Sequence, residues 1–102
     1  PPEKASREAR VLLTHNPDFA SFMLRSDTHQ FDLALCGHTH GGQIKLPVVG
    51  PLFYNCEDTR LGEDLYRARN THVFTSRGIG VVEFPFRINC PPEVNILILK
   101  RA

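Results

Sequence analysis

The chain has 102 residues, of which 41% are hydrophobic, and its formal net charge is +1 at neutral pH. This length allows one domain at most. The scattered charges give no nucleic-acid footprint, and no stretch approaches the roughly 18 apolar residues of a membrane-spanning helix. Three cysteines at irregular spacings argue against a disulfide framework and predict reduced thiols.

The first predicted elements form a strand–helix–strand unit. A short apolar run predicts a buried strand at about 10–14. Asn16 is a good N-cap and Pro17 suits a first helical turn, so a helix with an apolar stripe should run to about Ser26. A second strand follows at about 32–36. A strand, helix and strand in this space predict parallel strands with a right-handed crossover, whose carboxyl ends share one edge.

The second half of the chain predicts shorter elements. A short strand is expected at 44–45, followed at 46–55 by a loop with apolar side chains. That loop could pack on its own domain, shape a pocket or touch a membrane surface. Two strands at 65–69 and 72–75 should form a hairpin, and the alternation at 94–99 predicts a further strand.

Histidines follow both of the predicted parallel strands. His15 follows the first strand, while His38 and His40 lie in the sequence GHTHGGQ at 37–43, directly after the second. Glycines allow positive φ and close approach of the backbone to a ligand. Two imidazoles spaced by two residues can reach one ion or two adjacent ions, so this edge is a predicted metal site. The alternative is a set of solvated histidines at strand ends, as expected for His29 and His72.

These motifs resemble those of the calcineurin-like metallophosphoesterases. The sequences LLTHNPD at 12–18 and GHTHGGQ at 37–43 are similar to the C-terminal half of that family, in the form of a bacterial phosphodiesterase subgroup often tethered to the membrane. TSRGIG at 75–80, PFR at 85–87 and CPPE at 90–93 resemble its closing segment. The likeness implies an α/β fold. Residues 1–102 would then be the C-terminal part of a four-layer α/β/β/α sandwich, with one βαβ unit followed by hairpin strands.

The resemblance also implies a function and a site. The family hydrolyses phosphate ester or pyrophosphate bonds at a binuclear centre of two divalent ions, and imidazole alone does not choose among Mn, Fe, Zn and Ni. By this likeness His15 and His38 would bind one ion and His40 the other. Asn16 and Gln43 would line the substrate-binding site. Arg77 would either reach the phosphate or form a surface ion pair.

The family's Asp-x-His, Gly-Asp and Asn-His motifs have no counterpart in the right context. Residues 27–29, Asp-Thr-His, fit the first of these as letters but are predicted to form a helix-end loop. The chain is therefore expected to be half of an enzyme, with no catalytic residue of its own and no activity alone. One alternative is a non-catalytic half-domain that binds a metal or a partner. Another is a structural zinc protein that uses the three histidines, with Cys36 as an arguable fourth ligand.

Half of a sandwich leaves apolar strands uncovered. Parallel strands usually expect cover on both faces. The chain is therefore expected to pair with the missing N-terminal half, or with a copy of itself, through the uncovered sheet. The reduced cysteines predict a cytoplasmic location, and the resemblance adds a possible peripheral association of the full-length protein with the inner membrane.

Overall fold

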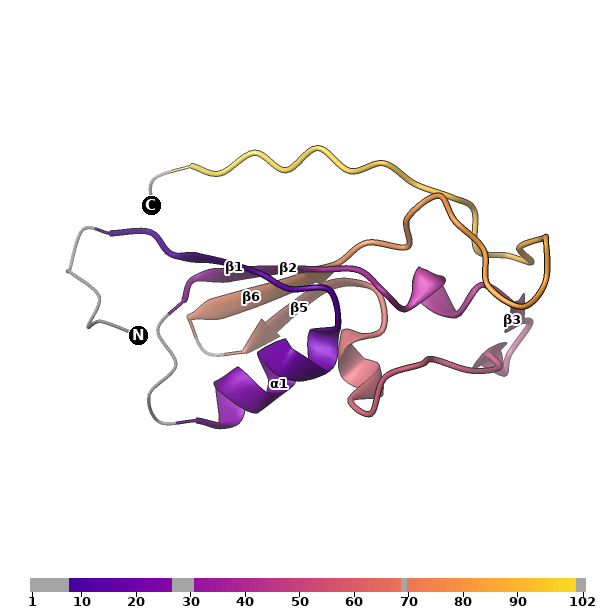
Figure 1. The fold of residues 1–102 in the computed structure, drawn as a ribbon, viewed down its shortest axis with the longest axis horizontal. Coiled ribbons are helices and arrows are strands. Elements are labelled where there is room, and N and C mark those ends of the chain that lie inside the picture. Colours follow the sequence, from indigo (N-terminus) through magenta and orange to yellow (C-terminus); the bar gives the residue numbers. More distant parts are fainter. Residues whose placement is uncertain (1–7, 27–30, 69, 101–102) are drawn as a thin grey trace.

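The computed structural model describes residues 8–26, 31–68 and 70–100, and it forms a small α/β domain with a mixed sheet (Figure 1). The sheet has four strands in the order β1-β2-β6-β5, and a separate hairpin pairs β3 with β4. The elements in chain order are β1 Val11–Leu13, α1 Pro17–Arg25, β2 Leu33–Cys36, β3 Lys45–Leu46, β4 Gly50–Pro51, β5 Asp64–Ala68 and β6 Thr71–Thr75, with short 3-10 turns at His40–Gly42 and Thr59–Leu61.

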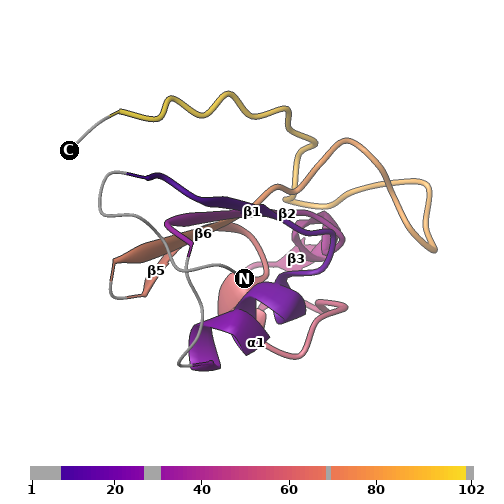
Figure 2. The same cartoon turned by 60° about the vertical axis from the view of Figure 1, so that its left-hand side comes forward.

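The predicted strand–helix–strand unit is confirmed. β1 and β2 are parallel, with Val11 opposite Leu33. The helix α1 begins at Pro17, and the side chain of Asn16 caps it by accepting a 2.9 Å hydrogen bond from the backbone N–H of Asp18. α1 lies against one face of the sheet in both views (Figure 2).

The predicted hairpin is also confirmed, although Arg69 lies outside the described residues, as does the Asp-Thr-His sequence at 27–29. β5 and β6 are antiparallel, and β6 then continues the sheet in parallel with β2. The short strand expected at 44–45 is found one residue later, as β3, and Ile44 forms an isolated bridge with Ile88.

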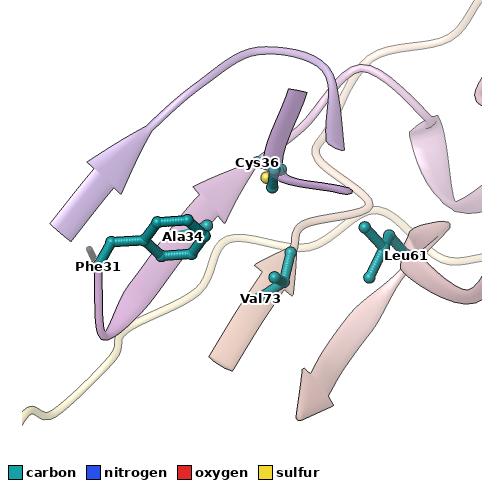
Figure 3. Packing of buried hydrophobic residues seen from close by; sticks show 6 residues of the cluster. Phe31, Ala34, Cys36, Leu61 and Val73 are labelled. Atoms are coloured by element: carbon teal, nitrogen blue, oxygen red, sulfur yellow. The ribbon is translucent and has the colours of Figure 1, made fainter. Parts of the chain in front are cut away.

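The buried core joins side chains of the sheet with side chains of α1, and Figure 3 shows five of its residues. It consists of small and medium-sized apolar side chains, namely Ala20, Phe31, Ala34, Cys36, Leu61 and Val73. Burial of Cys36 in this core raises the pKa of its thiol to about 11, which keeps it protonated and unreactive. All three cysteines are unpaired.

The opposite face of the sheet is exposed. Leu13 on β1 is 81% exposed and Leu65 on β5 is 59% exposed. Residues 94–100 run past this face on the side away from α1 (Figure 1). A cleft of about 410 Å³ lies between them, lined by Leu33, Phe74 and Leu97 among others. This face is where the described chain lacks a covering layer.

The prediction of a strand at 94–99 is wrong for this chain, because residues 94–100 join no sheet. The apolar alternation does mark an extended segment, but Ile96 is 89% exposed and Ile98 is 77% exposed. A β-strand also needs a neighbour for its N–H and C=O groups, and none of the described residues supplies one along this segment. No helix in the described ranges is both long and apolar enough to cross a membrane.

Candidate metal centre

His15 and His38 meet at the carboxyl edge of β1 and β2. The parallel pairing extends past both strand ends, because the N–H of Gly37 donates to the carbonyl of His15 over 3.0 Å. His38 Nδ1 and His15 Nε2 are 2.9 Å apart, and the two rings stand edge to face with their centroids separated by 4.7 Å. Two residues that lie 23 positions apart in the sequence thus present ring nitrogens to the same point.

His15 Nε2 and His38 Nδ1 form a direct hydrogen bond, and their separation can be compared with that in a site for a divalent cation. Two imidazoles on one tetrahedral ion, with metal–nitrogen bonds of about 2.0–2.1 Å, have nitrogens roughly 3.3 Å apart. The observed 2.9 Å lies within a few tenths of an ångström of that separation. A complete site needs more ligands than two, and no group of three or more His, Cys, Asp or Glu side chains that could hold a metal is found among the described residues.

His40 stands outside the His15–His38 pair. It lies in the short 3-10 turn after β2, and its backbone takes a positive φ of 53°. Its ring packs beside Gly80, where an added Cβ would lie 3.3 Å from His40 Cε1. The structure thus brings together the two histidines that the resemblance assigns to one ion, and separates the third. The metal-ligand role of all three stays a prediction.

The loop that carries these histidines is held in an unusual conformation. His38 and Gln43 also have positive φ, of 72° and 57°, which side chains with a Cβ rarely adopt. Such outliers persist only where the surroundings impose them, and they are concentrated at functional sites. Gly41 has no room for a side chain, because an added Cβ would lie 2.8 Å from Cys90 Sγ and would also overlap Arg77.

Gln43 and Asn16, the predicted substrate contacts, are both engaged within the chain. The amide of Gln43 is buried and donates 2.8 Å hydrogen bonds to the carbonyls of Phe84 and Phe86, while its oxygen accepts one of 2.7 Å from the N–H of Val82. Asn16 caps α1. Their contact with a substrate stays a prediction, and each has a structural role in the described chain.

Comparison with known proteins identifies the family. The chain is 41% identical over 99 residues to phosphodiesterase YaeI of Escherichia coli, and the matched region covers 97% of this chain and 35% of that protein. It is 38% identical over 90 residues to the uncharacterized metallophosphoesterase YkuE of Bacillus subtilis, covering 88% of this chain and 30% of the relative. The chain belongs to the metallophosphoesterase family.

The chain spans about a third of the length of these curated relatives. A transmembrane protein with a metallophosphoesterase domain from Danio rerio is 32% identical over 98 residues, which cover 90% of this chain and 20% of that protein. No protein-family model matches the chain, and no solved structure matches it.

Arg77 forms an ion pair, one of the two alternatives that the sequence leaves open. Its guanidinium lies 2.7 Å from the Glu93 carboxylate, which also accepts a 2.8 Å hydrogen bond from the backbone N–H of Arg77. Burial alone would raise the pKa of Glu93, but these bonds outweigh it and lower the pKa. The same bond to Glu93 raises the pKa of Arg77.

The sequence did not predict the role of Arg87, which connects the loop that carries His40 to residues 77–90. In the sequence, Arg87 lies within the PFR motif and Glu93 within CPPE, and neither motif by itself indicates the contacts of these side chains. The available signal is weak: Arg87 is a lone charge between the apolar residues Phe86 and Ile88. Such a position indicates a buried role for the guanidinium but not its partners.

Replacing Gln43 with alanine is expected to release the loop formed by residues 82–86. The substitution leaves two carbonyls and the N–H of Val82 without their partner, at a cost of roughly 1–3 kcal/mol. Hydrogen–deuterium exchange should show the Val82 amide losing its protection. Asn89→Ala, which removes one exposed hydrogen bond to the Lys45 carbonyl, is the control and should leave Val82 protected. Unchanged protection of Val82 in Gln43→Ala would contradict this role.

Proposed function

We propose that this chain is the C-terminal part of a metallophosphoesterase domain, with residues 1–102 contributing histidine ligands to a binuclear metal centre that hydrolyses phosphate esters. The observation that carries the proposal is the 2.9 Å approach of His15 Nε2 to His38 Nδ1 at the carboxyl edge of two parallel strands. Ligand sites in open α/β sheets lie at such edges.

His15 and His38 would hold one ion, and His40 the other. A pair of divalent ions supplies charge neutralisation at the phosphoryl oxygens and a hydroxide nucleophile at neutral pH. The printed name of the relative YaeI, a phosphodiesterase, supports phosphodiesters as the substrate class. Asn16 and Arg77 would contact the substrate through N–H groups that their contacts within the chain leave available. Both N–H groups of the buried Gln43 amide are used within the chain, so Gln43 would act on the substrate only through the loop that it holds.

The remaining ligands would come from an N-terminal half of the same domain. The family bridges its two metals with a carboxylate, and the described residues bring no carboxylate together with the histidine pair in a group that could hold a metal. The exposed sheet face and the cleft beneath residues 94–100 offer that half an apolar surface. A second sheet packed there would produce the four-layer sandwich.

The second candidate is a non-catalytic half-domain that binds one metal or a partner chain. The pairing of His15 with His38 without a carboxylate beside them among the described residues favours this second candidate. Two imidazoles alone can bind an ion weakly but cannot hold two ions together. The two proposals differ in whether an N-terminal half exists, which the reading frame upstream of Pro1 decides.

Activity assays on two forms of the protein test the proposal. The full-length protein should hydrolyse bis(4-nitrophenyl) phosphate with added manganese, and the purified 102-residue chain should not, because it lacks the bridging carboxylate. Turnover by the isolated chain, free of contaminating phosphatase, would show that these 102 residues carry all the catalytic groups themselves, and the proposal would fail. A full-length protein that binds manganese without turnover would favour the half-domain that does no chemistry.

A further inference from the structure

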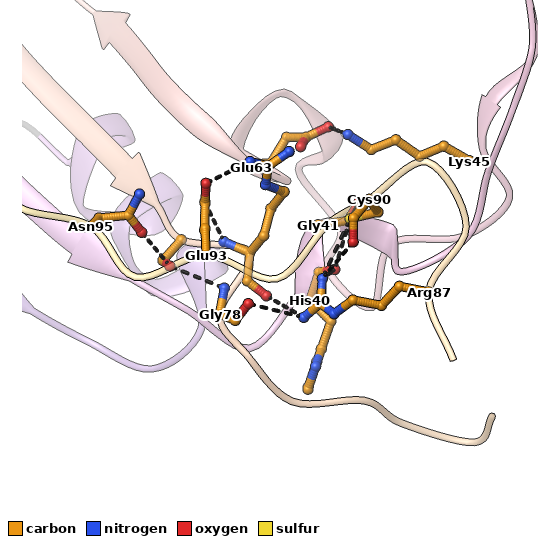
Figure 4. Close-up of polar contacts among 11 residues, drawn as sticks. His40, Gly41, Lys45, Glu63, Gly78, Arg87, Cys90, Glu93 and Asn95 are labelled. Carbon is orange, nitrogen blue, oxygen red and sulfur yellow. Dashed lines mark hydrogen bonds and ion pairs between the residues drawn. The ribbon is translucent and has the colours of Figure 1, made fainter. Parts of the chain in front are cut away.

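The guanidinium of Arg87 lies among five backbone carbonyls (Figure 4). Nη1 donates to the carbonyls of His40 and Cys90 over 3.2 and 3.1 Å. Nη2 donates to those of Arg77 and Gly80 over 2.7 Å each and approaches that of Gly78 at 3.2 Å. Nε donates to the Gly80 carbonyl over 3.1 Å.

These contacts use the whole donor capacity of the side chain. A guanidinium has five N–H groups in a fixed fork. Here one is on Nε and two on each Nη, and every nitrogen faces backbone oxygen. No carboxylate in the described ranges forms an ion pair with Arg87. The arrangement therefore leaves no N–H of Arg87 for a phosphate, and a role in binding substrate does not fit it.

The contacts converge on His40 from two sides. Arg87 binds the carbonyl of His40 itself, whose backbone has the uncommon positive φ of 53°. It also binds Gly80, the residue on which the ring of His40 packs. The thiol of Cys90 lies 3.4 Å from the same His40 carbonyl. Both the backbone of His40 and the surface beside its ring are thus attached to one side chain.

We infer that Arg87 is a positioning residue that sets the orientation of His40 toward its metal ion. The inference rests on the proposed function, since it assumes that His40 is a ligand. Lysine cannot replace the fork, because an ammonium has three donors around one atom and cannot reach carbonyls on three sides. Loss of an outer contact that orients a metal ligand typically costs about 10–100-fold in metal affinity.

Manganese binding by the metal-free full-length protein, followed by electron paramagnetic resonance, tests this inference. The wild type should bind two ions. Arg87→Lys should bind one of them about 10–100-fold more weakly, with the other, held by His15 and His38, unchanged. Arg60→Lys is the matched control, because the Arg60 guanidinium pairs with Asp58 at the surface and contacts no histidine among the described residues. It should bind both ions as the wild type does.

A second variant tests the same contact without altering Arg87. Gly80→Ala leaves Arg87 in place but puts a methyl group 3.3 Å from His40 Cε1, at a position whose φ is not left-handed. Gly80→Ala should lower the affinity for the ion that His40 would bind by several-fold, and circular dichroism should show an intact fold. If neither Gly80→Ala nor Arg87→Lys changes binding of either ion, or if both ions weaken equally, Arg87 does not position His40. A wild type that binds no manganese would overturn the proposed metal centre as well.

Discussion

Replacing His15 or His38 with alanine is expected to reduce phosphodiester hydrolysis by the full-length protein at least about 100-fold, since loss of even an outer contact to a metal ligand costs 10–100-fold. The two ring nitrogens lie 2.9 Å apart and would share one ion. Residues that act as a unit have non-additive effects. The double variant should therefore lose little more activity than either single variant. Steady-state kinetics at saturating manganese, with the four proteins compared in one assay, give the result.

Two further variants, one at a third predicted ligand and one control, test the same prediction. His40→Ala should also remove most of the activity, because His40 would hold the second ion. Arg60→Lys alters a guanidinium that pairs with Asp58 at the surface, and it should leave turnover near the wild-type value. If the effects of His15→Ala and His38→Ala multiply in the double variant, the two imidazoles act independently and the shared ion is wrong.

The isolated 102-residue chain is expected to self-associate at tens of micromolar. Leu13 and Leu65 are largely exposed on the face that lacks a covering layer, and β1 and β5 form open edges of the sheet. Burying a few hundred Å² of such surface is worth several kcal/mol, at roughly 25 cal/mol per Å². That is comparable with the whole stability of a small domain. Open strand edges add a template for pairing with another chain.

Light scattering measures this association, against a monomer mass of 11.5 kDa. Leu13→Lys with Leu65→Lys should shift the chain toward the monomer by placing charges on the exposed face. Phe22→Lys is the matched control, because Phe22 is 60% exposed on α1, which lies on the other side of the sheet. A wild-type chain that is a monodisperse monomer and melts cooperatively would show that these residues close their own core, and the half-domain proposal would fail.

Local patterns in the sequence were sufficient for most elements. The helix α1 follows from Asn16 as a cap, Pro17 at the first turn and an apolar stripe, all of which act within a few residues. The hairpin of β5 and β6 follows from two short apolar runs around a turn. These signals are reliable because short-range sterics and hydrogen bonds determine them.

The segment 94–100 shows where such a pattern is insufficient. Alternating apolar residues do indicate extended backbone, and Val94, Ile96 and Ile98 are extended and exposed. Membership of a sheet depends in addition on a neighbouring strand, and a local pattern carries no information about that neighbour. The prediction of a strand therefore failed at the step that needs a long-range partner.

The candidate site likewise has one part that the sequence predicts and another that depends on tertiary contacts. The approach of His15 to His38 could be predicted because two parallel strands joined by a helix must end at one edge. The sequence alone could not show that Gln43 holds the 82–86 loop, or that Arg87 donates to the backbone carbonyls of both His40 and Cys90. These contacts join residues up to 47 positions apart. Only the folded chain determines them, because backbone carbonyls carry no sequence signature and acquire specific partners when tertiary packing brings the segments together.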